Sequence, residues 1–286
     1  MENSFEVAVD AVASGDVAGL HSLLVEMPSL ATARSSRAHQ ATLLHYIAAN
    51  GVENEPQKTP ENAPSVVEAL VAAGTEVNAL SQIYGGGPAS TPLHLTVTSA
   101  HPAQAGNQAQ IVATLCEAGA SVNGVDNKGG PVRGVLAFMY PPGGFYESQY
   151  IAARTTLNVL IERGAQIDDI FAAIVLRRLD QFQRSLEEVL ASKTARLRAF
   201  SLACLSGQQE IATLLLEGKV DINGSYAQNE TGLHLAAATD EIGMVKFLVD
   251  HGADVTRRDD RYGLIPLEWA VRFDRGEVRA YLEQAA

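Results

Sequence analysis

The feature that most constrains the fold of this chain is a sequence phrase that occurs five times along it. The phrase is a short apolar helical run, then a glycine, then two or three residues that end in Val or Ile, usually followed by Asn or Asp. The copies occupy residues 70–78, 115–123, 160–168, 215–221 and 248–255. Repeats of this kind predict stacked copies of one helical unit, because a single unit cannot bury its own apolar face.

A second phrase precedes several copies of the first. It reads Thr-Pro-Leu-His-Leu at 91–95 and Thr-Gly-Leu-His-Leu-Ala-Ala at 231–237, and variants begin at Thr42 and Ile265. Thr caps helix N-termini well, and Pro is tolerated at the first helical position because the amide there has no helical partner. This phrase therefore predicts the start of the first helix of each unit. The glycine of the first phrase predicts the left-handed turn that ends the second helix.

The residues of both phrases resemble the ankyrin repeat, whose signature is Thr-Pro-Leu-His-x-Ala with a period of about 33 residues. The resemblance covers most of the chain and is most specific at 91–123 and 231–255. It implies an all-α ankyrin-repeat solenoid of about eight helix-pair units with short hairpin fingers. It also implies a protein–protein interaction module, and a structural role for His45, His94 and His234 at the His position of the signature.

The units predict a single repeat domain over residues 1–286. Its expected parts are an N-terminal cap unit at 5–30, three enlarged repeats at 42–168, a degenerate repeat at 169–192, two near-standard repeats at 197–255 and a C-terminal cap at 263–284.

The glycine spacing shows where the repeats are enlarged. Gly218 and Gly252 are 34 residues apart, whereas Gly74, Gly119 and Gly164 follow one another at intervals of 45. The extra residues are expected mostly between the two helices of a unit, at 51–64, 100–107 and 140–150. Equivalent loops of stacked repeats lie beside one another, so these insertions predict one thickened edge. Departures from a local rule are expected at functional sites.

Candidate contact residues come from these enlarged units. Five of the 17 aromatic residues lie within 13 positions, namely Phe138, Tyr140, Phe145, Tyr146 and Tyr150. They have two interpretations, either packing of a long loop against its neighbours or direct contact with a partner. The residues predicted to bind a partner or ligand, through the concave face and the thickened edge, are Tyr84, His101, Tyr140, Phe145 and Tyr146.

An alternative from another class is a small-molecule binder or an unusual enzyme with a pocket under the insertions of residues 42–168. Its polar candidates are Tyr84, His94, His101, Arg133 and Tyr140. A purely structural or self-associating scaffold also remains open. No catalytic residues, metal ligands or cofactor are predicted, because two cysteines cannot complete a zinc site and the chain has no Gly-x-Ser-x-Gly sequence.

The charge balance bears on the partner. The formal net charge of −12 argues against nucleic acid as the partner, because phosphate binding needs clustered Lys and Arg. It favours a protein partner with a basic or amphipathic contact surface.

No run approaches the roughly 18 apolar residues that a membrane span needs. The first residues lack the basic and apolar regions of a secretory signal, so a cytoplasmic location is expected. The sequence leaves the oligomeric state open.

Overall fold

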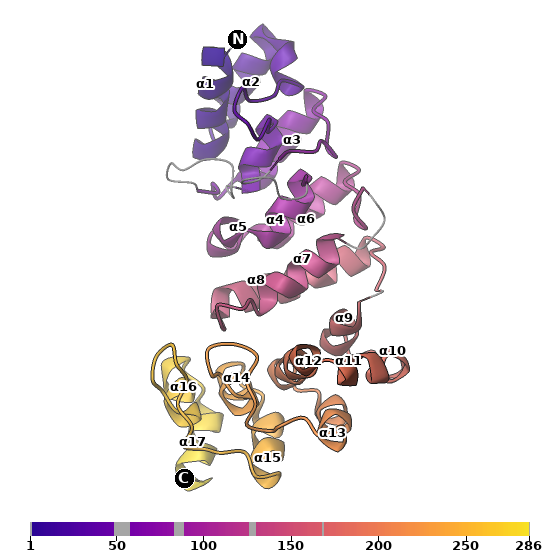
Figure 1. Ribbon diagram of the computed structural model, residues 1–286. Coiled ribbons are helices and arrows are strands. Elements are labelled where there is room, and N and C mark those ends of the chain that lie inside the picture. Colours follow the sequence, from indigo (N-terminus) through magenta and orange to yellow (C-terminus); the bar gives the residue numbers. More distant parts are fainter. Residues whose placement is uncertain (1, 49–57, 83–88, 126–129, 168, 286) are drawn as a thin grey trace. The chain divides into compact units, whose positions relative to one another are not determined.

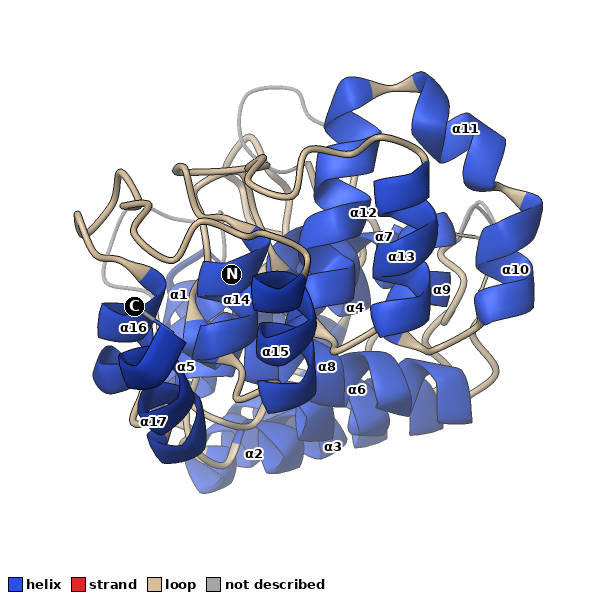
Figure 2. Ribbon diagram, turned by 90° about the horizontal axis from the view of Figure 1, so that it is seen from below, coloured by secondary structure: helices blue, strands red, loops and turns tan. Residues whose placement is uncertain are grey.

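The computed structural model describes residues 2–48, 58–82, 89–125, 130–167 and 169–285. Within these residues the regular elements are helices joined by loops (Figures 1 and 2). Two isolated antiparallel bridges join Ser81 with Ser90 and Ser225 with Thr231, and the second closes a short hairpin finger. The predicted all-α repeat fold is confirmed. The chain divides into two compact units. Unit 1 comprises Met1–Met139 and Ser148–Gln166, and unit 2 comprises Tyr140–Glu147 and Ile167–Ala286.

Unit 1 consists of helix pairs in which first and second helices alternate along the chain. Its elements are α1 (Glu2–Ser14), α2 (Val17–Glu26), the 3-10 helices η1 (Pro28–Ala31) and η2 (Leu43–Ala48), α3 (Ala63–Ala72), α4 (Pro92–Thr98), α5 (Ala100–Gln104), α6 (Gln108–Glu117), α7 (Gly130–Met139) and α8 (Glu147–Glu162), of which the first residue belongs to unit 2. The first helices α1, η2, α4 and α7 contact one another in that order, and α2, α3 and α6 form a second row.

Unit 2 repeats this organisation. Its helices are α9 (Ile170–Val175), α10 (Leu179–Arg184), α11 (Leu186–Ala191), α12 (Lys193–Leu205), α13 (Gln209–Glu217), α14 (Gly232–Ala238), α15 (Ile242–Asp250), α16 (Pro266–Arg272) and α17 (Gly276–Ala285). The first helices α9, α12, α14 and α16 contact one another in order. In chain order the described helices of both units form eight pairs, with η1, α5 and α11 as additional short helices.

The asparagine that follows the recurring Val or Ile links neighbouring repeats. The Asn78 side chain donates to the carbonyl of Gly119 over 2.9 Å and accepts from the amide of Ser121 over 2.8 Å. Asn123 accepts from the amide of Gln166 in the same way, and Asn223 accepts from the amide of Asp254. These bonds satisfy polar backbone groups of the neighbouring repeat, and they explain the Asn that follows Val77, Val122 and Ile222.

Two histidines of the signature confirm the predicted structural role. Nδ1 of His45 accepts from the amide of Thr42, and its Nε2 lies 3.1 Å from the carbonyl of Ser90 in the next repeat. His234 makes the same contacts with Thr231 and with the carbonyl of Leu264. Because Nδ1 accepts a hydrogen bond, the ring proton is on Nε2, which donates it to the carbonyl of the next repeat. Each ring thus joins two adjacent repeats.

One detail of the repeat spacing differs from the sequence analysis. The backbone enters the left-handed region at Gly74, Gly119, Gly164 and Gly252, but in the intervening repeat Lys219 does so with φ +60°, not Gly218. The left-handed residue after the second helix of that repeat therefore lies one position later than the glycine predicts. Lys219 and Gly252 are 33 residues apart, which is the standard period of the repeat.

The inter-helix insertions of unit 1 are described in part. Residues 49–57 of the first insertion lie outside the described residues, whereas the second insertion forms α5. The Asn107 side chain at the end of this second insertion donates to the carbonyls of Pro60 and Glu61 in the preceding repeat. Residues 140–147 of the third insertion belong to unit 2, so a continuous thickened edge stays a prediction. Among the described helices, none combines the length and the apolar character that a membrane crossing requires.

Candidate functional site

A pocket of about 230 Å³ lies on the finger side of unit 1. Finger residues and first-helix residues of two neighbouring repeats form its walls, and we call it the finger groove. Its lining residues are Leu80, Ala89, Ser90, Thr91, His94, Gly124, Val125, Gly130 and Pro131. The groove is smaller than the roughly 300–1,000 Å³ of ordinary small-molecule sites, and it is lined largely by small residues.

Two exposed apolar side chains border the finger groove. Leu80 is 42% exposed and Val125 is 53% exposed, which places them among the large hydrophobic residues that the described surface leaves to solvent. Each lies six residues after the glycine of its repeat, Gly74 or Gly119, so they occupy equivalent positions in adjacent fingers. A repeated pair of exposed apolar residues beside a hollow is typical of a surface that binds another protein.

His94 lies between these two fingers. Its amide donates to the Thr91 hydroxyl over 3.2 Å, as expected at a helix N-terminus, and its ring is half-buried in the groove wall. His45 and His234, by contrast, are fully buried. The signature histidine of this repeat is therefore also a groove-lining residue.

The polar candidates of the small-molecule alternative are not gathered around the finger groove. His94 lines the groove, Arg133 is exposed on α7, and Tyr140 belongs to unit 2. His101 lies on α5, and Tyr84 falls outside the described residues. The structure therefore gives the small-molecule alternative no convergent polar set among the described residues.

A second candidate region is the segment Tyr140–Glu147, which we call the inserted segment. It belongs to unit 2, although the helices before and after it in sequence belong to unit 1. The Phe145 side chain is 1% exposed, and its ring centroid lies 6.0 Å from that of Trp269 and 5.6 Å from that of Phe273. The inserted segment is thus held in unit 2 by an aromatic anchor near the C-terminal helices.

Side chains of unit 2 also bind the backbone of this segment. The Phe145 amide donates to Oε2 of Glu230 over 2.8 Å, and the Phe145 carbonyl accepts from the Arg261 guanidinium over 2.6 Å. The same guanidinium stacks on the Tyr146 ring at 3.7 Å, and Glu147 forms an ion pair with Arg275. Every residue from 145 to 147 therefore has a specific partner in unit 2.

The electrostatics of this region centre on Glu230, whose side chain is completely buried. Burial raises the pKa of Glu230 to about 7, and the Phe145 amide, the Tyr140 hydroxyl and Arg261 partly oppose that shift. Burial likewise raises the pKa of Tyr140, whose ring lies against Tyr226 at 5.5 Å. The carboxyl group of Glu230 is therefore close to its titration point at neutral pH.

The predicted contact residues have different positions. Tyr84 lies outside the described residues, and His101 is half-buried on α5, where its amide donates to the Ser99 hydroxyl. Tyr140 and Phe145 are each 1% exposed, so in this structure they serve packing and offer no surface to a partner. Tyr146 is 39% exposed and remains a candidate for contact.

Other residues of these regions were not identified from the sequence. Leu80 and Val125 were detectable in principle, because both lie six residues after a repeat glycine. Glu230, Arg261 and Trp269 carry no such signal. Arg261 follows Phe145 by 116 residues, and no local pattern links the two.

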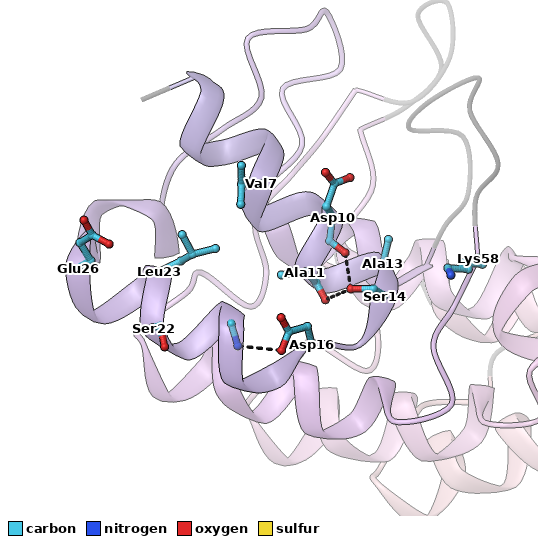
Figure 3. A pocket seen from close by; sticks show the side chains of 11 residues that line it. Val7, Asp10, Ala11, Ala13, Ser14, Asp16, Ser22, Leu23, Glu26 and Lys58 are labelled. Carbon is cyan, nitrogen blue, oxygen red and sulfur yellow. Dashed lines mark hydrogen bonds between the residues drawn. The ribbon is translucent and has the colours of Figure 1, made fainter.

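An open pocket of about 730 Å³ lies over the first helix pair of unit 1 (Figure 3). Asp10, Asp16 and Glu26 give it an acidic rim, with Lys58 as a single basic residue, and Val7 and Leu23 supply apolar surface. Oδ1 of Asp16 accepts from the Gly19 amide, so this carboxylate caps α2. Such a surface repels anions and agrees in sign with the net charge of the chain.

Comparisons with known proteins bear on the family. A family model described as ankyrin repeats (3 copies) matches residues 191–285. Alpha-latrocrustotoxin-Lt1a of Latrodectus tredecimguttatus is 35% identical over 80 residues, which are 28% of this chain and 6% of that protein. Palmitoyltransferase AKR1 of Lachancea kluyveri is 27% identical over 99 residues, which are 34% of this chain and 13% of that protein. The matched regions thus span only a small part of these curated relatives.

Among solved structures, the crystal structure of the human ASB11 ankyrin repeat domain is similar at 18% identity and a TM-score of 0.41. That match covers 98% of this chain and 97% of the other. In this chain, the three matched copies at 191–285 coincide with the helix pairs α12/α13, α14/α15 and α16/α17. Together with the contacts of the signature histidines, this match over about a third of the chain supports an ankyrin-repeat protein.

Proposed function

We propose that the protein is a non-catalytic interaction module that binds a partner protein in the finger groove of unit 1. Ankyrin repeats generally mediate protein–protein interaction, and the proposal assigns that role to particular residues here. The observation that carries it is the pair of exposed apolar residues, Leu80 and Val125, at equivalent positions beside the groove. Apolar anchors that flank a shallow hollow supply affinity by area and need no chemistry.

The size and lining of the groove support a polypeptide as the ligand. A hollow of about 230 Å³ holds one or two side chains of a partner rather than a whole small molecule. His94, Ser90 and Thr91 place polar groups in the same wall, where they meet backbone groups of a bound chain. His101, on α5 of unit 1, stays a further contact residue in this proposal, whereas Tyr146 belongs to unit 2 and stays a predicted contact residue apart from the finger groove.

Two unpaired cysteines support a cytoplasmic setting for this interaction. Cys116 is half-buried, Cys204 is buried, and neither forms a disulfide. Secreted domains commonly use their cysteines in disulfides, whereas reducing compartments keep them free. We include the cytoplasmic location in the proposal on this ground.

The proposal is tested by affinity capture from the cells that produce the protein. The wild type is compared with a Leu80→Asp/Val125→Asp double variant and with Ile151→Asp as control, since Ile151 is 56% exposed on α8 of the same unit. Each buried apolar anchor contributes about 1–2 kcal/mol, so the double variant should lose captured partner by tenfold or more. Ile151→Asp should retain it.

Circular dichroism and thermal unfolding of all three proteins establish that the substitutions leave the fold intact. Because both Leu80 and Val125 are exposed, neither change should lower the melting temperature by more than a few degrees. Capture of the same partners in equal amounts by the folded double variant would show that the finger groove is not the binding surface.

A further inference from the structure

The inserted segment is held by unit 2 in the way that a peptide ligand is held by a recognition domain. Three consecutive residues, Phe145, Tyr146 and Glu147, each contact different side chains of unit 2. The helices that flank the segment in sequence, α7 and the rest of α8, belong to unit 1. Within unit 2 the segment is therefore a separate piece of chain, while α9–α17 follow one another without interruption.

The apolar part of this recognition is built on a fixed aromatic pocket. Trp269 is completely buried, and its indole nitrogen donates to Oδ2 of Asp259 over 2.9 Å. The same carboxylate accepts from the amides of Arg261, Tyr262 and Leu264, so it links the loop before α16 to the tryptophan. The pocket that receives Phe145 is thus organised by contacts among residues of unit 2 itself.

The polar part of the recognition comes from three further side chains of unit 2. Glu230 accepts from the Phe145 amide, and Arg261 donates to the Phe145 carbonyl and stacks on Tyr146. Arg275 pairs with Glu147, while its Nε donates to the carbonyl of Ala238 at the end of α14. Because that bond fixes the guanidinium before any ligand binds, little conformational freedom is lost when a carboxylate pairs with it.

These contacts define which chemical groups the site can bind. The site accepts an aromatic ring in the pocket of Trp269 and Phe273, a second ring on Arg261, and a carboxylate on Arg275. We propose that unit 2 carries a recognition site for a segment of a partner protein that contains aromatic and acidic residues. In this structure the chain's own inserted segment occupies that site. The residues of the site are Glu230, Arg261, Trp269, Phe273 and Arg275.

Because the inserted segment occupies the site, it blocks a partner from binding there, so the site is autoinhibited. A tethered segment is present at a high effective concentration, so a competing segment binds only the fraction of molecules in which the site is open. A partner with the same chemistry therefore binds the intact chain weakly. It binds tightly once contacts of the resident segment are removed. This site lies in unit 2 and is independent of the finger groove.

The experiment uses the full chain and a fluorescein-labelled synthetic peptide with the sequence of residues 140–148. Binding is measured by fluorescence anisotropy to the wild type and to Phe145→Ala, which removes the resident anchor. Trp269 is the one tryptophan of the chain, so its emission reports independently when a phenylalanine fills the pocket. We expect saturable binding to Phe145→Ala with an affinity at least tenfold higher than for the wild type.

Altered peptides test the chemistry without any change to the protein. A peptide with Ala in place of its Phe should not bind. A peptide with Lys in place of its Glu should bind at least threefold more weakly, because it places a cation beside Arg275. A scrambled peptide that binds as well as the native sequence would overturn the proposal.

A second variant guards against loss of folding in Phe145→Ala. The double variant Tyr146→Ala/Glu147→Ala removes two contacts of partly exposed side chains and leaves the buried Phe145 in place. It should bind the peptide with an affinity between those of the wild type and Phe145→Ala. Absence of saturable binding to both folded variants would overturn the proposal. So would a concentration-dependent dimer whose formation excludes the peptide, because the occupant would then be a second copy of this chain.

Discussion

At the scale of single residues, buried polar groups decide how neighbouring repeats are joined. Burial lowers the pKa of His45 and of His234 to about 4, so both rings are neutral near pH 7. A neutral ring accepts at Nδ1 and donates at Nε2, which is the arrangement that the carbonyls of Ser90 and Leu264 require. Their protonation opposes folding, and this contribution to stability is lost as the pH falls from about 6.5 towards 4.

Glu230 has the opposite dependence. Its pKa rises from 4.5 in the unfolded chain to about 7 in the folded protein. Below pH 4.5 both states hold the proton. Between pH 4.5 and 7 the unfolded chain releases it while the folded protein retains it, so this group lowers stability as the pH rises through that range. Above about pH 7 the loss is complete.

The first prediction concerns the substitution Glu230→Gln, which keeps the shape of the side chain and removes its titration. Relative to the wild type, the variant should gain up to about 3 kcal/mol of unfolding free energy between pH 4.5 and pH 7.5. Urea unfolding at both pH values measures this difference, and the histidine contributions cancel because both proteins share them. Glu217→Gln, at an exposed position, should show no such change. Parallel pH curves for the wild type and Glu230→Gln would contradict the prediction.

At the scale of elements, the inserted segment depends on one glycine for its path. Gly144 has φ +97°, and a Cβ atom there would lie 2.5 Å from Oε1 of Glu230 and 3.0 Å from Cγ of Gln228. At neighbouring Gly143 the nearest atom to such a Cβ is the Tyr146 hydroxyl at 3.8 Å, an ordinary contact. The structure therefore requires a glycine at position 144 but not at position 143.

We predict that Gly144→Ala lowers the free energy of unfolding by about 1–3 kcal/mol, through backbone strain and a clash with a buried carboxyl group. Gly143→Ala should change it by less than about 0.5 kcal/mol. Denaturant unfolding followed by the emission of Trp269 measures both, since the anchor Phe145 lies beside that indole. A loss for Gly144→Ala no larger than that for Gly143→Ala would contradict the prediction that the inserted segment needs glycine at position 144.

At the scale of the whole molecule, repeats transmit a disturbance only through their neighbours. The contacts of Phe145 lie within unit 2, at Glu230, Arg261, Trp269 and Phe273. Its loss should therefore be felt in α14 and α16, and hardly at all in α3 and α6 of unit 1.

Hydrogen exchange of the Phe145→Ala variant tests this statement. Amides of α16 should exchange at least tenfold faster than in the wild type, which corresponds to about 1.4 kcal/mol of lost local stability. Amides of α3 and α6 should exchange at their wild-type rates. A uniform increase across both units would show that the chain unfolds as one cooperative body.

The sequence by itself determined the repeat. Thr-Pro-Leu-His and the glycine turns act over a few residues, so they predicted the helix starts, the structural role of His45 and His234 and the eight helix pairs. The asparagines of the fingers were visible as part of the same phrase. These features repeat because each unit must cap its first helix and reverse the chain after its second helix.

Only the tertiary structure decided what the insertions do. The aromatic residues at 138–150 allowed both a packing and a binding interpretation, and the burial of Phe145 against Trp269 and Phe273 was settled by contacts more than a hundred residues apart in the chain. Such contacts depend on which surfaces the stacked repeats bring together, and the periodic pattern of the sequence does not predict them. The exposure of Leu80 and Val125 is also a tertiary property, because it depends on what the neighbouring finger leaves uncovered.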